Sequence, residues 1–446
     1  MNTAALIHKD VWRLAGPMIL SNLTIPLLGL VDTAVMGHLP ETYYIGAVAI
    51  GGLIFSFIFW GFGFLRMGTT GLTAQAYGQN DADETRAIVG RVLIIALVFS
   101  SIVLLLQAPI KLAALTILEA SHEVEFYAGE YFSIRIWGTP ATLINYGLIG
   151  WFIGMQRVSG PLYILLIINI TNIVLDLLFV IGFGMDVAGV ALASVIAEYL
   201  GLIVGLYLLH KTLKLYPGHW QYDLILSVDK IKHLMMLNKD IFIRTLCLIF
   251  SFSFFTAQGA KHGDLILATN AVLMNLQTFM AYGLDGFAHA AEALVGRAVG
   301  RKSRREFHAA IKTTTVWSLG VALLFVTAYG LFGNWIVNLI TDIDSIREMA
   351  KLYLPWLIIA PILSVWSYLL DGIFIGATRS TEMRNTMLIS TFLFFLPAWW
   401  LLQPLGNHGL WAALMVFMVA RGITMGVSYQ NFKHEYTIPS TLSKSG

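Results

Sequence analysis

The sequence has little cysteine and little charge. Cys247 is the one cysteine among 446 residues, which excludes an intrachain disulfide and any site built on two thiolates. Charged side chains make up 12% of the chain, against roughly 25% in soluble domains. The formal net charge of +2 is too small to indicate a polyelectrolyte partner, and we expect no binding of nucleic acid.

Apolar residues are abundant instead, at 57% of the chain, and the mean hydropathy is +0.74. A helix needs about 20 apolar residues to cross a bilayer, because its backbone must satisfy its own hydrogen bonds there. Twelve runs meet this condition: 11–36, 43–67, 90–112, 126–150, 160–181, 187–209, 240–259, 265–288, 312–337, 350–374, 386–402 and 409–430. We therefore predict an all-α, multi-pass membrane protein with 12 transmembrane helices.

Both ends of the chain are expected to lie inside the cell. The first run is too long for a cleaved signal peptide and is interrupted by Pro17 and Pro26, so we expect it to be retained. With the N-terminus inside, the inner connections carry nineteen Lys and Arg residues and the outer ones four. The positive-inside rule then places both termini in the cytoplasm.

The two halves of the sequence repeat each other. The phrase GWFIGMQR at 150–157 recurs as GIFIGATR at 372–379. Six predicted helices per half is an even number, so both copies insert with the same orientation, as in transporters that rock one bundle against another. We expect an amino-terminal lobe (1–210), a cytoplasmic linker (211–239), a carboxy-terminal lobe (240–432) and a cytoplasmic tail (433–446).

Polar side chains inside the apolar runs are the candidate functional residues. A charge near the membrane centre costs roughly 2.5–3.5 kcal/mol, so those retained usually face a cavity or a partner. Asp32 lies in the first run and Ser194 in the sixth. Asn172 and Asp176 lie four residues apart in the fifth run, on one helical face. All four are predicted in the outer half of the membrane, where they can meet.

Two carboxylates, an amide and a hydroxyl supply the oxygen ligands that suit a hard cation such as Na⁺. Two close carboxylates in a low dielectric can equally retain a shared proton. The internal repeat provides a control, because the four equivalent positions of the second half are all apolar: Phe255, Phe394, Ala398 and Leu414. A polar network needed only for packing should occur in both halves, so we favour ion coupling.

Other polar residues and prolines in the runs are secondary candidates. Glu198 lies one turn beyond Ser194 and is a possible accessory ligand. Pro17 and Pro26 each remove a backbone donor from the first helix, which favours bending and makes them candidates for gating.

Further charges lie towards the inner ends of their runs. Asp285, Glu292 and Asp371 are expected to be solvated there or paired with Arg297 or Arg379. Arg66, Arg135 and Arg244 are candidates to neutralise acidic residues or to contact anionic lipid, with snorkelling as the simpler account for Arg66 and Arg244.

The sequence resembles the multidrug and toxic compound extrusion (MATE) family, in particular its bacterial DinF-like branch. The matching phrases extend over nearly the whole chain: PLLGLVDTAVMGHL, FLRMGTTGLTAQAYG, LASVIAEY, NAVLMNLQTFMAYGLDGFAHAAEALVG and YLLDGIFIGATRSTEMRN. The resemblance implies two six-helix lobes in a V-like arrangement. It also implies H⁺- or Na⁺-driven export of amphipathic, often cationic drugs. We expect the protein to act in the bacterial inner membrane as a monomer in contact with membrane lipids and without a cofactor.

The resemblance also implies a set of ion-coupling residues. The family's site in the amino-terminal lobe uses an Asp on the first helix, an Asn and an Asp four apart on the fifth, and a Thr or Ser on the sixth. These positions match Asp32, Asn172, Asp176 and Ser194. The family's proline associated with bending of the first helix corresponds to Pro17. Phe255 stands where a different branch begins an acidic site on the seventh helix, which argues against that arrangement here.

Two other classes of function compete with an antiporter. A flippase for lipids or lipid-linked saccharides is the nearest alternative. An anionic lipid, however, should require several cationic side chains in the middle of the membrane, where we expect only Arg135. An integral membrane enzyme is disfavoured, because the chain contains no HExxH, GxSxG, DDxxD or P-loop motif. The sequence leaves the choice between H⁺ and Na⁺, and the physiological substrate, open.

Overall fold

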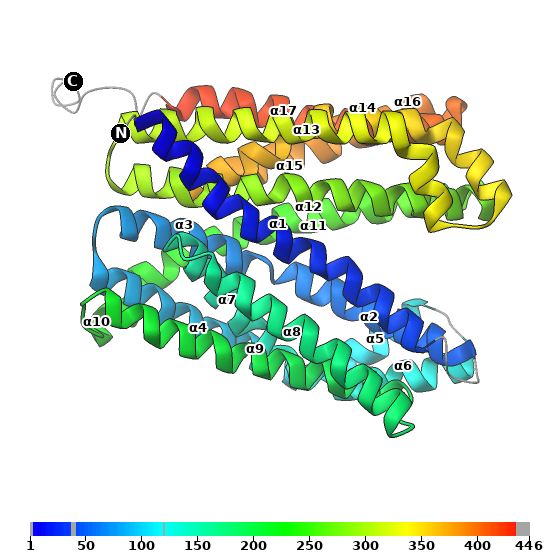
Figure 1. Ribbon diagram of the computed structural model, residues 1–446, viewed down its shortest axis with the longest axis horizontal. Helices are drawn as coiled ribbons and strands as arrows, with labels where there is room; N and C mark the ends of the chain where they lie inside the picture. Colours follow the sequence, from blue (N-terminus) through cyan, green and yellow to red (C-terminus); the bar gives the residue numbers. More distant parts are fainter. Residues whose placement is uncertain (1–2, 37–41, 119–120, 434–446) are drawn as a thin grey trace. The chain divides into compact units, whose positions relative to one another are not determined.

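Figure 1 shows the computed structural model of the chain, which describes residues 3–36, 42–118 and 121–433. Within these ranges, the structure does not describe the side chains at 3–7, 26–34, 36, 42 and 118. Every regular element in the described residues is a helix. The chain divides into an amino-terminal unit, Leu20–Met235, and a carboxy-terminal unit, Met1–Ile19 with Met236–Gly446.

The helices of the amino-terminal unit follow one another with short connections. Helix α1 (Thr3–Met36) begins in the carboxy-terminal unit and ends in this one. It is followed by α2 (Thr42–Gly61), α3 (Phe64–Gly78), α4 (Ala82–Leu105), α5 (Gln107–Leu118), α6 (His122–Arg135), η1 (Ile136–Gly138), α7 (Thr139–Gly154), α8 (Ser159–Asp176), the π-helix η2 (Leu177–Gly182), α9 (Val187–Leu215) and α10 (Tyr222–Ile225).

The carboxy-terminal unit contains the longer helices. Helix α11 (Val228–Ala260) starts before the boundary and continues through it. Then come α12 (Asp264–Gly300), α13 (Arg304–Ile340), α14 (Asp344–Gly376), α15 (Ser380–Ile389), the π-helix η3 (Ser390–Phe395), α16 (Leu396–Leu402), η4 (Gln403–Leu405) and α17 (Asn407–Lys433).

Ten helical stretches among the described residues are long and apolar enough to cross a membrane, and they overlap ten of the predicted runs. The other two predicted runs are 11–36 and 126–150. The first lies on α1, whose side chains are described in part, and the second is distributed over α6, η1 and α7. The predicted all-α, multi-pass fold class is confirmed.

The unit boundaries differ from the predicted lobe boundaries at the start of the chain. The segment Met1–Ile19 belongs to the carboxy-terminal unit, not to the lobe predicted for 1–210. The physical reason is aromatic packing: the Trp12 ring lies edge-on against Phe287 and Trp317, with centroid separations of 5.4 and 5.0 Å. Hydropathy detects that a helix is buried but not which neighbour buries it.

The predicted linker also differs from the structure. Most of 211–239 belongs to the amino-terminal unit instead of standing apart as a hinge. Arg86 on α4 donates to the backbone oxygens of Leu213 and Tyr216, and Glu84 forms an ion pair with Lys230. The predicted tail, apart from Lys433, lies outside the described residues.

The sequence repeat is also a repeat of local structure. Asn80 and its counterpart in the second half, Lys302, both adopt left-handed backbone conformations, with φ of 57° and 53°. Gln156 and its counterpart Thr378 have φ of 59° and 56°. Each of the four lies just after a helix end, where a left-handed residue lets the chain reverse. The two halves therefore use the same turns at the same positions.

Close helix packing repeats in the same way. A side chain at Gly150 on α7 would place its Cβ 2.3 Å from the backbone oxygen of Arg66 on α3. A Cβ added at the equivalent Gly372 on α14 would likewise lie 2.3 Å from the backbone oxygen of Ala288 on α12. Each unit thus brings two helix backbones together at a glycine, which is how many membrane helices associate.

Candidate ion-binding site

A buried polar face runs along helix α8. Asn169, Asn172 and Asp176 recur at the three- and four-residue spacing that places side chains on one helical face, and all three are buried. Asn172 is 1% exposed and Asp176 is 0% exposed. Polar groups withdrawn from water to this degree need partners, because an unsatisfied amide or carboxylate costs several kcal/mol in an apolar medium.

Asn172 connects this face to helix α9. Its amide lies 3.0 Å from Oγ of Ser194. We assign the orientation in which the amide nitrogen donates to Oδ2 of Asp176 at 3.1 Å and the amide oxygen accepts from the backbone nitrogen and Oγ of Ser194, at 3.1 and 3.0 Å. This orientation satisfies both ends of the amide. The structure therefore brings Asn172, Asp176 and Ser194 together in one polar cluster.

Asp32 lies on α1, and its side chain is outside the described residues. The same holds for Pro26. That Asp32 joins the cluster therefore stays a prediction. Pro17 lies on α1 just before the point where this continuous helix passes from the carboxy-terminal to the amino-terminal unit. A role of Pro17 in gating likewise stays a prediction.

Two residues that the sequence analysis did not single out connect α1 to the polar face. Nδ2 of Asn169 donates to Oγ1 of Thr24 at 2.5 Å. The Thr24 hydroxyl in turn donates to the backbone oxygen of Ser21 at 2.7 Å. Asn169 stands one turn before Asn172 on the same face, so the helical spacing of polar residues in an apolar run was the signal that could have revealed it.

Glu198, the predicted accessory ligand, takes part in a different network. Its Oε2 and its backbone oxygen each accept from Nδ2 of Asn145 at 3.1 Å. Its Oε1 lies 3.5 Å from Nη2 of Arg135, whose guanidinium stands over the rings of Phe55 and Phe59. Because Arg135 offsets the charge of Glu198, this carboxylate is a weak candidate to bind a cation.

The equivalent positions of the carboxy-terminal unit are apolar, but only two of them, Phe255 and Leu414, are buried; Phe394, equivalent to Asn172, is 44% exposed. Phe255, at the position equivalent to Asp32, is 1% exposed, and its ring lies edge-on to Trp411 at 5.0 Å. Leu414, equivalent to Ser194, is also buried in the core of this unit. The polar cluster on α8 and α9 is therefore not a feature that the repeated fold requires twice.

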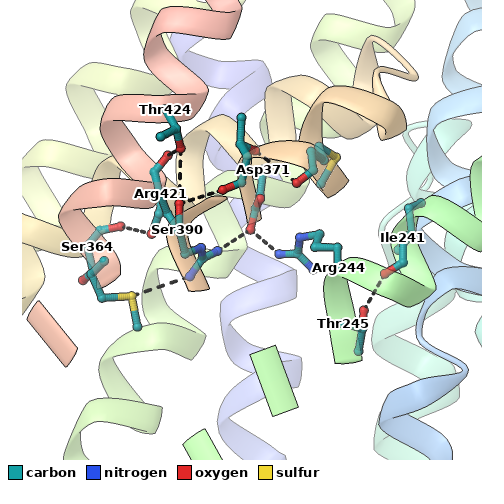
Figure 2. Close-up of polar contacts among 12 residues, drawn as sticks. Ile241, Arg244, Thr245, Ser364, Asp371, Ser390, Arg421 and Thr424 are labelled. Carbon is teal, nitrogen blue, oxygen red and sulfur yellow. Dashed lines mark hydrogen bonds and ion pairs between the residues drawn. The ribbon is translucent and has the colours of Figure 1, made fainter. Parts of the chain in front are cut away.

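The carboxy-terminal unit carries a buried ion cluster of its own (Figure 2). Asp371 on α14 lies between Arg244 on α11 and Arg421 on α17, and its Oδ2 accepts from Nη2 of Arg421 at 2.8 Å. The prediction that Asp371 pairs with Arg379 or faces the interface is wrong, and Arg244 does not snorkel, because it is 5% exposed. Asp371 is thus shared by two guanidinium groups that come from helices distant in sequence, and it offsets one of their two positive charges.

The comparisons with known proteins agree with this fold. The sequence profile of the MatE family matches residues 17–178 and 241–400. The chain is 44% identical to DNA damage-inducible protein F of Escherichia coli strain K12, over 95% of this chain and 92% of the relative. It is 23% identical to the probable multidrug resistance protein NorM of Thermotoga maritima, over 87% of this chain and 83% of the relative.

Solved structures share the fold. A MATE family transporter of the MOP superfamily in an outward-facing conformation matches with a TM-score of 0.86 at 18% identity, covering 98% of this chain and 99% of that one. A MATE in a bent conformation matches with a TM-score of 0.87 at 17% identity, covering 98% of this chain and 100% of that one. At such identities the match shows the fold alone.

The fold, the profile and the relatives together define a multi-pass membrane transporter and not an enzyme. The chain belongs to the MatE family, and its predicted resemblance to the MATE family and to the DinF-like branch is confirmed.

Proposed function

We propose that the protein is a secondary antiporter that couples the entry of H⁺ or Na⁺ to the export of amphipathic, often cationic compounds. The observation that carries this proposal is the polar cluster of Asn172, Asp176 and Ser194, whose three counterparts in the other half of the sequence are the apolar residues Phe394, Ala398 and Leu414. We infer that Asp32 completes this site. We also propose that the protein acts in the bacterial inner membrane with both termini in the cytoplasm.

The cluster has the chemistry to hold a small cation. The carboxylate of Asp176 can take up a proton or bind Na⁺. The hydroxyl of Ser194, and the amide oxygen of Asn172 once it is released from Ser194, are hard oxygen ligands that suit Na⁺. Without a cation, a buried carboxylate is costly to keep charged, and the Asn172 amide offsets part of that cost by donating to it. Cation binding thus stabilises whichever conformation keeps the cluster closed.

Coupling follows when the cation and the exported compound prefer different conformations of the same protein. A ligand shifts a conformational equilibrium only by its differential affinity for the two states. Binding of H⁺ or Na⁺ at the cluster then lowers the affinity for the exported compound. Binding of the compound lowers the affinity for the cation by the same factor. The compound class is supported by the similarity to the T. maritima relative, a probable multidrug resistance protein.

The test is efflux from proteoliposomes under separately imposed H⁺ and Na⁺ gradients, using a fluorescent cationic dye. Wild type is compared with Asp32→Asn and Asp176→Asn, and with Asp342→Asn as the control, because Asp342 is a fully exposed acid outside the cluster. We expect the two cluster variants to lose gradient-driven efflux while the control retains it. Full gradient-driven efflux in both cluster variants would reject the proposed site.

The same liposomes distinguish the flippase alternative. Translocation of a fluorescent lipid, measured by its accessibility to a membrane-impermeant quencher, is followed beside dye efflux. Lipid translocation without dye efflux would replace the antiporter proposal with a flippase.

A further inference from the structure

A cavity of about 520 Å³ lies where helix α9 ends, and the proposed transport function makes no use of it. Its walls come from the start of α4, the last turns of α9 and the segment that follows α9. The lining residues are Arg86, Leu206, Leu209, His210, Leu213, Lys214, Pro217, Gly218 and Trp220. All of them belong to the amino-terminal unit, so the cavity is complete within that unit.

Arg86 forms the buried base of this cavity. The residue is 7% exposed, and its Nη2 donates to the backbone oxygens of Leu213 at 2.8 Å and Tyr216 at 2.6 Å. Its Nε is also buried but forms no hydrogen bond within the described part of the chain. Gly218 keeps the space above it open, since a Cβ there would lie 3.0 Å from that nitrogen. A buried, unsatisfied donor on a cation favours an anionic ligand.

The charges around the cavity are mostly positive. His210 and Lys214 are exposed lining residues, and Arg157 lies over the ring of Tyr216, whose backbone oxygen Arg86 binds. Asp83 is the acidic side chain that faces this region. Its two carboxylate oxygens already accept from the backbone nitrogen of His219 and from Nε2 of Gln221, both at 2.6 Å. These donors are neutral, so Asp83 keeps its negative charge, but the two lining cations Arg86 and Lys214 outnumber it and leave the cavity with a net positive charge.

One wall of the cavity is apolar and continues onto the exposed surface of α9. Leu209 and Leu213 are buried, whereas Leu206 is 41% exposed and Trp220 is 47% exposed. Leu206 stands one turn from His210 on α9, so an apolar strip leads directly into the basic site. A free phosphate would use only the basic end, whereas a phospholipid would use both.

We propose that this cavity binds an anionic phospholipid, with its phosphate against Arg86 and Lys214 and an acyl chain along Leu206 and Leu209. Basic pockets beside the cytoplasmic ends of transmembrane helices are suited to anionic headgroups, and the leaflet there is rich in them. Tryptophan at the rim is typical of a residue that sits at the headgroup level. Because the cavity joins α4, α9 and the segment after α9, bound lipid holds that segment against the amino-terminal unit.

The experiment uses Trp220 as a local reporter. The purified full-length protein in phosphatidylcholine nanodiscs is titrated with brominated phosphatidylglycerol, which quenches nearby tryptophan fluorescence. Lipid binding at the cavity is measured as the difference in fluorescence quenching between wild type and Trp220→Phe. We expect this difference to saturate with brominated phosphatidylglycerol and to be absent with brominated phosphatidylcholine at the same mole fraction.

Variants on the rim separate a built site from general surface charge. Lys214→Gln is expected to raise the lipid fraction at half-saturation about fivefold, the effect of one lysine near an anionic surface. Lys211→Gln is the matched control, because Lys211 is exposed at the same end of α9 but does not line the cavity, and it should change half-saturation less than about twofold. Arg86 is left unchanged, since it also caps α9.

Three outcomes would overturn the proposal. Equal quenching by the two brominated lipids would show that no headgroup is recognised. An equal effect of Lys211→Gln and Lys214→Gln would show diffuse attraction to the surface. Displacement of the lipid by soluble glycerol phosphate at equal concentration would show that the acyl chain contributes nothing. None of these depends on transport, so the result is independent of the proposed antiport.

Discussion

Asn172 on α8 and Ser194 on α9 are joined twice, since the amide oxygen of Asn172 accepts from both the backbone nitrogen and the hydroxyl of Ser194. This pairing holds two helices in register beside the carboxylate of Asp176. It also joins an amide, a hydroxyl and a carboxylate in one polar cluster. Substitutions at these contacts can distinguish a role in ion binding from a role in helix packing.

Ser194→Ala removes the hydroxyl but leaves the backbone hydrogen bond to Asn172. We expect the apparent affinity for the coupling ion in proteoliposome efflux to fall about tenfold, equal to about 1.4 kcal/mol. Stability should fall by about 1 kcal/mol, since one hydrogen bond is lost. Ser194→Thr keeps the hydroxyl and should retain coupling. Unchanged ion dependence in the alanine variant would remove Ser194 from the site.

Thr24→Val tests the hydrogen bond that ties α1 to α8. Valine has nearly the shape of threonine but cannot accept from Asn169, which is left with an unsatisfied buried donor. We expect a loss of about 1–3 kcal/mol in the free energy of unfolding, measured by denaturant titration in detergent. Asn169→Leu in the same background removes the unsatisfied group and should recover part of the loss. An additive loss in the double variant would contradict a direct bond.

Asp371→Asn leaves Arg244 and Arg421 buried without a carboxylate between them. Breaking a buried ion cluster by removing one partner typically costs about 3–5 kcal/mol, and we expect a destabilisation of that size. The triple variant with Asp371, Arg244 and Arg421 all changed to apolar residues should be more stable than the single one. Both are compared by thermal unfolding with Asp342→Asn, an exposed acid, as the control. A single variant as stable as this control would show that the cluster is not held by its charges.

Gly150→Ala and Gly372→Ala test the repeated helix contacts. Each new Cβ would meet a backbone oxygen at 2.3 Å, so the helices must separate, at a cost of about 1–3 kcal/mol. Gly320→Ala on α13 is the control, because no atom of the described residues beyond its chain neighbours and its own helix backbone lies within 4 Å of the Cβ position. There the substitution should leave stability unchanged or raise it by up to about 1 kcal/mol. The ranking is read from melting temperatures in one detergent, and equal effects at the three positions would contradict it.

Part of the candidate site could be predicted from local spacing. Asn172 and Asp176 are four residues apart in an apolar run, and a helix must place them on one face. Ser194 follows on the next predicted run, and its meeting with Asn172 was expected from depth in the membrane. Thr24 was missed because a threonine in an apolar helix is common and usually bonds to its own backbone, so its residue type alone did not distinguish it.

The ion cluster of the carboxy-terminal unit could not be predicted in the same way. Asp371 was assigned to basic residues close to it in sequence, but its partners Arg244 and Arg421 come from two other helices. Helix packing brings these distant residues together, and the low dielectric then makes their pairing obligatory. Nothing in the hydropathy of a single run reports which other runs surround it.

The sequence by itself determined that the chain is a helical membrane protein, that its halves repeat and that α8 carries a polar face. These properties follow from composition and from spacing along one helix, since a bilayer demands long apolar helices and a helix has a fixed period. Only the tertiary structure decided which helices share each buried polar group, and that Met1–Ile19 packs with the carboxy-terminal unit. Such choices depend on contacts between residues far apart in the chain, where shape and charge must fit together in three dimensions.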